Sequence, residues 1–151
     1  MQYRFVLLAF VMGLMGCTES IIHDEILAAK SAVEFAQAAF VKRDVEGSYA
    51  LLSDSGKRYV SPETFKQTLS RLHPKAFPVS VTASEYEPMP GEKAMHIYLK
   101  GENSGERFYY RLTMEGAAAT GYRVVRLYRG SEPYPWSSLR QKLKEPISAR
   151  S

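Results

Sequence analysis

Cys17 is the side chain of this sequence best equipped for chemistry, because it is the one cysteine among 151 residues. A cysteine can form a disulfide, ligate a metal, act as a nucleophile or carry a lipid. With no second thiol in the sequence, no disulfide can form within it. Residues 1–4, which include the basic Arg4, and the apolar run 5–15 precede Cys17. This layout is typical of a secretory signal, and the run is shorter than the roughly 20 apolar residues that span a bilayer.

The apolar run ends in Leu14-Met15-Gly16-Cys17. These residues resemble the bacterial lipobox, in which an apolar, a variable and a small residue precede the cysteine. The resemblance implies that residues 1–16 are a signal peptide and that Cys17 is diacylated, with palmitate among its acyl chains. Two acyl chains anchor a protein stably, since each buried methylene contributes about 0.8 kcal/mol and one chain alone is marginal. A plain signal peptide or signal anchor with an incidental cysteine is the alternative.

Thr18 follows the cysteine, where by the same resemblance an Asp would favour the inner membrane. The expected location is therefore the cell envelope, at the outer membrane and facing the periplasm. Residues 17–21 form a short lipidated tether in this interpretation, so partners in the envelope are favoured over freely diffusing ones.

Net charge and the spacing of the histidines argue against a nucleic-acid partner and against a metal site. Net charge is +4, and removing residues 1–16 leaves 19 basic against 16 acidic side chains, too small an excess to indicate nucleic acid. His23, His73 and His96 lie far apart and lack metal-ligand spacing. We predict that all three are solvated surface residues and that the protein holds no metal and no other cofactor.

The rest of the chain changes from a helical period to a strand period near residue 76. Apolar residues at spacings of three and four predict a long helix over 22–42 and short helices near 45–52 and 61–72. Alternation predicts four half-buried strands at 79–84, 95–100, 107–114 and 122–129, joined by short polar turns into an antiparallel meander. Residues 131–151 are predicted to be an irregular tail with a candidate short helix at 137–144.

Helices followed by antiparallel strands predict an α+β fold. This order resembles the NTF2-like (cystatin-like) cone over residues 22–130, with matching segments at 42–49, 51–53, 61–65 and 121–125. The resemblance implies a curved four-stranded sheet that wraps the long helix and leaves a conical pocket, whose lining would include Phe65, Tyr110 and Tyr122.

Some proteins of this fold superfamily are enzymes of the ketosteroid-isomerase or dehydratase type, which need an acid or histidine pair in the cone. Here alternation places no carboxylate at an inward strand position. The inward residues look apolar, namely Met95, Ile97, Leu99, Leu112 and Met114, and Tyr110 and Tyr122 could donate hydrogen bonds. A non-catalytic binding or assembly module is therefore favoured. A cone-pocket enzyme and a carrier of a small apolar ligand remain as alternatives.

The outward sheet face mixes aromatic and cationic side chains, namely His96, Tyr98, Tyr109, Arg111 and Arg126. Tyr and Arg are enriched in interface hot spots. The face is either a set of stabilising cross-strand pairs or a docking surface for an envelope protein or a second copy of the chain.

The lipid attachment predicts a direct result for Cys17→Ala. The variant should lose incorporation of radiolabelled palmitate, keep its uncleaved size and leave the membrane fraction. A variant with wild-type size and membrane fraction, together with unlabelled wild-type protein, would contradict the lipoprotein interpretation.

Overall fold

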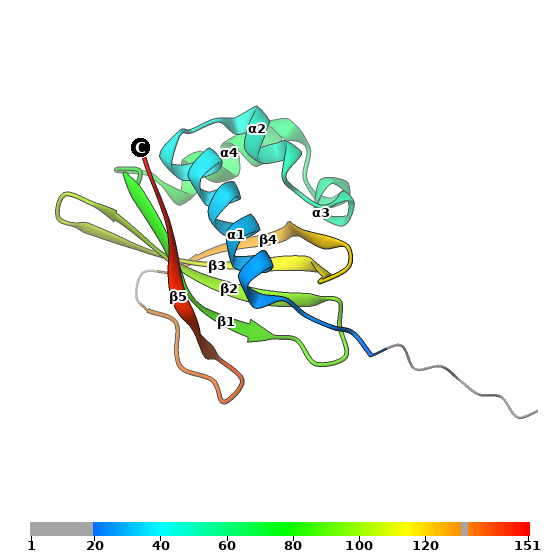
Figure 1. Ribbon diagram of the computed structural model, residues 1–151. Coiled ribbons are helices and arrows are strands. Elements are labelled where there is room, and N and C mark those ends of the chain that lie inside the picture. The colour runs from blue at the N-terminus through cyan, green and yellow to red at the C-terminus, as the bar shows by residue number, and fades with distance from the viewer. Residues whose placement is uncertain (1–19, 131–132) are drawn as a thin grey trace, which may run out of the picture.

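The computed structural model describes residues 20–130 and 133–151 (Figure 1). The predicted signal peptide and Cys17 lie outside them. Within the described ranges no helix is long and apolar enough to cross a bilayer. The helices are α1 (Glu25–Ala36), its π-helical continuation η1 (Gln37–Val41), α2 (Val45–Ala50), α3 (Asp54–Tyr59) and α4 (Pro62–Leu72). The strands are β1 (Ser80–Pro88), β2 (Ala94–Asn103), β3 (Glu106–Ala117), β4 (Gly121–Gly130) and β5 (Gln141–Arg150).

The fold is α+β, with one five-stranded sheet in the order β4-β3-β2-β1-β5. Every neighbouring pair of strands is antiparallel, as the meander prediction requires for β1 to β4. The prediction of four strands is wrong, because β5 pairs along the outer edge of β1. The folded unit therefore extends to Arg150 and does not end at residue 130.

The predicted helix at 137–144 is also wrong, and a bulge explains the error. Glu85 pairs with Lys142 and Ala83 pairs with Ile147, so β5 uses six residues where β1 uses three. The bulge puts Leu143 and Ile147, the apolar residues that face the core, four positions apart. That spacing imitates a helix. Pro146 is tolerated because β5 is an edge strand.

Four helices begin at side-chain caps. Asp24, Asp44, Ser53 and Ser61 each accept a hydrogen bond from the backbone N–H three residues further on. Ser61 begins α4, which matches the helix predicted near 61–72, whereas Ser53 begins α3, a helix that was not predicted. The long helix starts at Glu25 and not at Ile22, which is 69% exposed.

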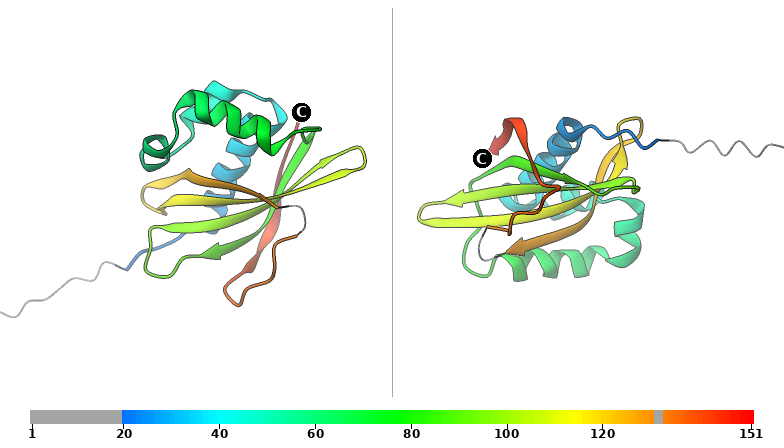
Figure 2. Two further views of the ribbon diagram at one scale, coloured as in Figure 1. Left: turned by 180° about the vertical axis from the view of Figure 1, so that it is seen from behind. Right: turned by 90° about the horizontal axis from the view of Figure 1, so that it is seen from below.

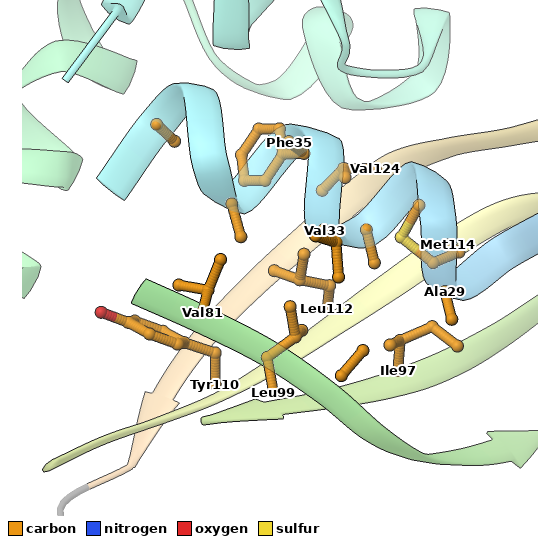
Figure 3. Packing of buried hydrophobic residues seen from close by; sticks show 14 of the residues in the cluster. Ala29, Val33, Phe35, Val81, Ile97, Leu99, Tyr110, Leu112, Met114 and Val124 are labelled. Atoms are coloured by element: carbon orange, nitrogen blue, oxygen red, sulfur yellow. The ribbon is translucent and has the colours of Figure 1, made fainter. Parts of the chain in front are cut away.

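Helix α1 lies across one face of the sheet, as Figure 3 shows for Ala29, Val33 and Phe35 above the strands. Its buried side is rich in small residues: Ala28, Ala29, Ala32 and Ala36 of α1 and Ala39 of η1 are fully buried. The inward strand residues predicted from alternation are confirmed, since Met95, Ile97, Leu99, Leu112 and Met114 are all buried. The space between helix and sheet is therefore filled.

Helices α2, α3 and α4 gather at the β4 end of the sheet (Figures 1 and 2). The connection between α2 and α3 runs along β4, where Leu52 forms a parallel bridge with Val124. This bridge partly covers an edge that would otherwise present unpaired backbone groups.

The close approach of α1 predicts that Ala32→Leu destabilises the fold. The larger side chain has no room against the sheet, and overpacking of this kind costs about 1–3 kcal/mol of unfolding free energy. Chemical denaturation measures the change. Lys30→Leu, which adds the same side chain at an exposed position of α1, is the matched control. Equal effects of the two substitutions would contradict this account of the packing.

Candidate functional site

A cleft with a volume of about 600 Å³ is the candidate site. It opens between α1, the connection from α2 to α3, and the end of the β3–β4 hairpin. Most of its lining is polar, and the residues that could act on a ligand are Glu34, Asp54, Ser55, Glu115, Tyr122 and Arg123.

Ser55 and Glu115 meet because the start of α3 is tied to β4. The backbone N–H of Ser53 donates to the Val124 carbonyl at 2.8 Å, and the Ser53 hydroxyl caps α3 by accepting from the Gly56 N–H. This sets the Ser55 hydroxyl against Glu115, where it donates to Oε1 at 2.9 Å.

The second carboxylate oxygen of Glu115 is the unusual atom of the cleft. Oε2 is buried, and no donor from the described residues reaches it. Arg123 lies opposite Glu115 in the strand register, but its guanidinium donates to the Ala50 carbonyl at 3.0 Å. A buried acceptor without a donor carries a desolvation cost, so the Glu115 carboxylate would gain by turning this oxygen towards a donor in the cleft.

Tyr122 connects the cleft to the segment that leaves the domain. Its hydroxyl accepts from the Asp24 N–H at 2.9 Å and lies 3.2 Å from His23 Nδ1. His23 Nε2 lies 3.0 Å from the Glu92 carbonyl, which only accepts, so Nε2 carries the proton and Tyr122 donates to Nδ1. The Ala118 N–H donates to the Ile22 carbonyl at 2.9 Å. Residues 22–24 are therefore fixed between the β1–β2 turn and the β3–β4 hairpin.

The prediction of a surface position for His73 is wrong, because this side chain is 4% exposed. His73 follows α4 and turns back into the core, where Nδ1 donates to the Leu69 carbonyl at 2.9 Å. Nε2 is then the acceptor, and the Tyr110 hydroxyl donates to it at 2.7 Å. Burial lowers the pKa of His73 and raises the pKa of Tyr110.

Of the three predicted pocket residues, only Tyr122 reaches the large cleft. Phe65 and Tyr110 are buried members of the core and leave no lining for a conical pocket there. In the part of the chain that the structure describes, no three His, Cys, Asp or Glu side chains are grouped so that they could hold a metal ion.

Part of the predicted docking face is covered by Tyr134 and Arg140, which precede β5. Tyr98 is 6% exposed, because Arg140 lies over its ring at 3.8 Å from the centroid and Tyr134 packs edge-on at 5.7 Å. The Tyr98 hydroxyl donates to Glu87 at 2.7 Å, and burial raises the pKa of Tyr98 to about 12.

The other four residues of that face keep some exposure. His96 is half-buried, and its Nδ1 lies 3.1 Å from the Thr113 hydroxyl oxygen. The Arg111 guanidinium lies between the rings of Tyr128 and Tyr134, at 5.3 Å from each centroid. Tyr109 is half-buried and Arg126 is exposed.

The lowered pKa of His73 predicts a loss of stability in weak acid. The unfolded state, with a histidine pKa of 6.5, binds a proton more readily than the folded state. The contribution is therefore complete above pH 6.5 and is lost as pH falls from 6.5 towards the folded pKa, by about 1.4 kcal/mol for each unit of lowering.

NMR titration of the His73 ring measures the folded pKa directly. The His73→Gln variant cannot titrate there, so its unfolding free energy should fall less between neutral pH and pH 5.5 than that of the wild type. His96, whose pKa burial also lowers, titrates in both proteins and cancels in the comparison. A folded His73 pKa at or above 6.5 would refute the prediction.

Comparison of the chain with protein-family models, with curated proteins and with solved structures gives no match. A function is therefore inferred from three features: the cleft, the Glu115 Oε2 atom that has no donor among the described residues, and residues 22–24, where the chain leaves the domain.

Proposed function

We propose that this chain is a lipid-anchored protein of the bacterial cell envelope whose domain is an NTF2-like, non-catalytic binding module. The lipobox resemblance of Leu14-Met15-Gly16-Cys17 supports the anchor. Helices before strands, with α1 across an antiparallel sheet, support the family. In this proposal β5 is an addition to the four-stranded cone.

The observation that carries the binding role is Glu115, which lines the cleft beside Tyr122 and whose Oε2 has no donor among the described residues. A carboxylate oxygen that has lost its water is best satisfied by a charged N–H donor. The charged lining residues are Glu34, Asp54 and Glu115 against the single cation Arg123. The ligand is therefore a group that donates hydrogen bonds and carries positive charge, such as a lysine or arginine side chain of an envelope protein.

The alternative of a cone-pocket enzyme, an isomerase or a dehydratase, has weaker support. The titratable pair under the sheet is His73 and Tyr110, and both side chains are occupied with each other and enclosed by Phe40, Phe77 and Phe108. A carrier of a small apolar ligand is likewise less favoured, because Phe65 and Tyr110 pack within the core.

A second candidate is protein docking on the outward sheet face. Tyr128 is 58% exposed beside Arg111, and Arg126 and Tyr109 lie on the same face. Exposed tyrosine and arginine together favour a protein partner or a second copy of the chain there.

A titration followed by NMR tests the cleft. The mature chain, residues 17–151 with Cys17→Ser, is titrated with N-acetyl-arginine amide. Amide shifts should change at Ser55, Glu115, Thr120 and Tyr122. A hydrogen bond to a charged group contributes about 1.5–3 kcal/mol, so Glu115→Gln should weaken binding roughly tenfold or more.

Glu63→Gln, at an exposed carboxylate of α4, is the matched control and should bind as the wild type does. Equal binding by the Glu115→Gln variant would remove the cleft from the proposal. Shift changes confined to Tyr109, Arg111 and Tyr128 would favour the second candidate.

A further inference from the structure

The segment from residue 133 to 140 carries two large apolar side chains into solvent. It leads from the β4 edge of the sheet to β5 at the opposite edge, across the outward face. Trp136 is 62% exposed and Leu139 is 45% exposed. Trp136 is also the one tryptophan of the chain.

The backbone that carries these two side chains is held in place by Arg140. Arg140 is 9% exposed and pairs with Glu85. Its guanidinium also donates to the Tyr134 carbonyl at 2.8 Å and to the Pro135 carbonyl at 3.2 Å. Proline restricts the backbone further at residues 133 and 135. Because the segment is already ordered, covering Trp136 and Leu139 would cost little conformational entropy.

The braced segment and the exit of the chain lie at the same end of the molecule. Figure 1 and the left view of Figure 2 place residues 20–24 and the connection into β5 at the lower end, on opposite sides. Residues 22–24 are fixed there by the hydrogen bonds of His23 and by the bond from Ala118 to the Ile22 carbonyl, and the Ile22 side chain is exposed. The four steps from Cys17 to Ile21 span at most about 14 Å. A lipid on Cys17 would therefore hold this end close to the bilayer.

We propose that Trp136 and Leu139 form a second membrane contact and insert into the interface between headgroups and acyl chains. The inference rests on the proposed lipid anchor. Tryptophan favours this interface because its ring is apolar while its N–H stays near water. The anchor makes the second contact intramolecular, so a weak interaction is enough to be populated. Two contacts on opposite sides of one end fix the tilt of the domain, and with it the height of the cleft beside Tyr122.

The single tryptophan makes the contact measurable. Lipidated protein purified from membranes is reconstituted into vesicles of phosphatidylethanolamine and phosphatidylglycerol. Trp136 emission should move to shorter wavelength relative to the unlipidated Cys17→Ser protein in buffer, and brominated acyl chains in the vesicles should quench it. Leu139→Ser should reduce both effects.

The matched control moves the tryptophan to the other end of the molecule. In a Trp136→Phe, Tyr59→Trp double variant the probe replaces a side chain that is 84% exposed at the end of α3, away from the proposed contact. Its emission should be unquenched by the same vesicles.

Flotation and intact mass separate this inference from the anchor. Acylated protein that floats with the vesicles, but whose Trp136 is quenched no more than the control tryptophan, overturns the second contact and leaves the anchor standing. A chain without acyl mass on Cys17 overturns both.

Discussion

The close packing of α1 on the sheet is the constraint on which the rest of the structure depends. A helix face of alanines brings the backbone of α1 near the strands, and the long side chains of β2 and β3 fill the remaining space. A filled interior leaves no conical pocket around Phe65 and Tyr110. Space for a ligand exists at the rim, where α1, α3 and the β3–β4 hairpin diverge and Glu115 meets Ser55. The cleft therefore lies at the rim of the packed core and not inside it.

The same packing explains the polar pair in the core. Phe40 stacks on Tyr110 with ring centroids 4.4 Å apart. Because the Tyr110 ring packs in the core, its hydroxyl is buried as well. A buried hydroxyl is costly unless it is hydrogen-bonded, and His73 provides the acceptor. The imidazole in turn donates to the Leu69 carbonyl. His73 and Tyr110 therefore satisfy each other as structural groups, and a proton donor and acceptor deep under the sheet do not by themselves make a catalytic site.

Local periodicity predicted the elements whose burial is regular. The apolar face of α1 from Ile26 onward and the alternation in β1 to β4 follow directly from contacts with one core. Interactions between distant segments were not predictable in this way. Tyr98 has the pattern of an outward residue and is covered by Arg140, and Glu115 occupies an outward position yet lines the cleft. The β5 bulge removed the period of two that would have identified that strand.

Strand β1 and the turn after it contact both the segment with Trp136 and residues 22–24, where the chain leaves the domain. Glu85 in β1 holds Arg140 and so the segment with Trp136. The turn that follows β1 presents the Glu92 carbonyl to His23 and so holds the exit of the chain. A strand and its turn are stiff compared with a loop, because hydrogen bonds to β2 and β5 support β1 on both sides. β1 and its turn therefore connect the exit of the chain to the segment at the opposite side of the sheet. If Cys17 carries the proposed lipid, this connection would let the domain keep one orientation on the membrane although the tether has only a few residues.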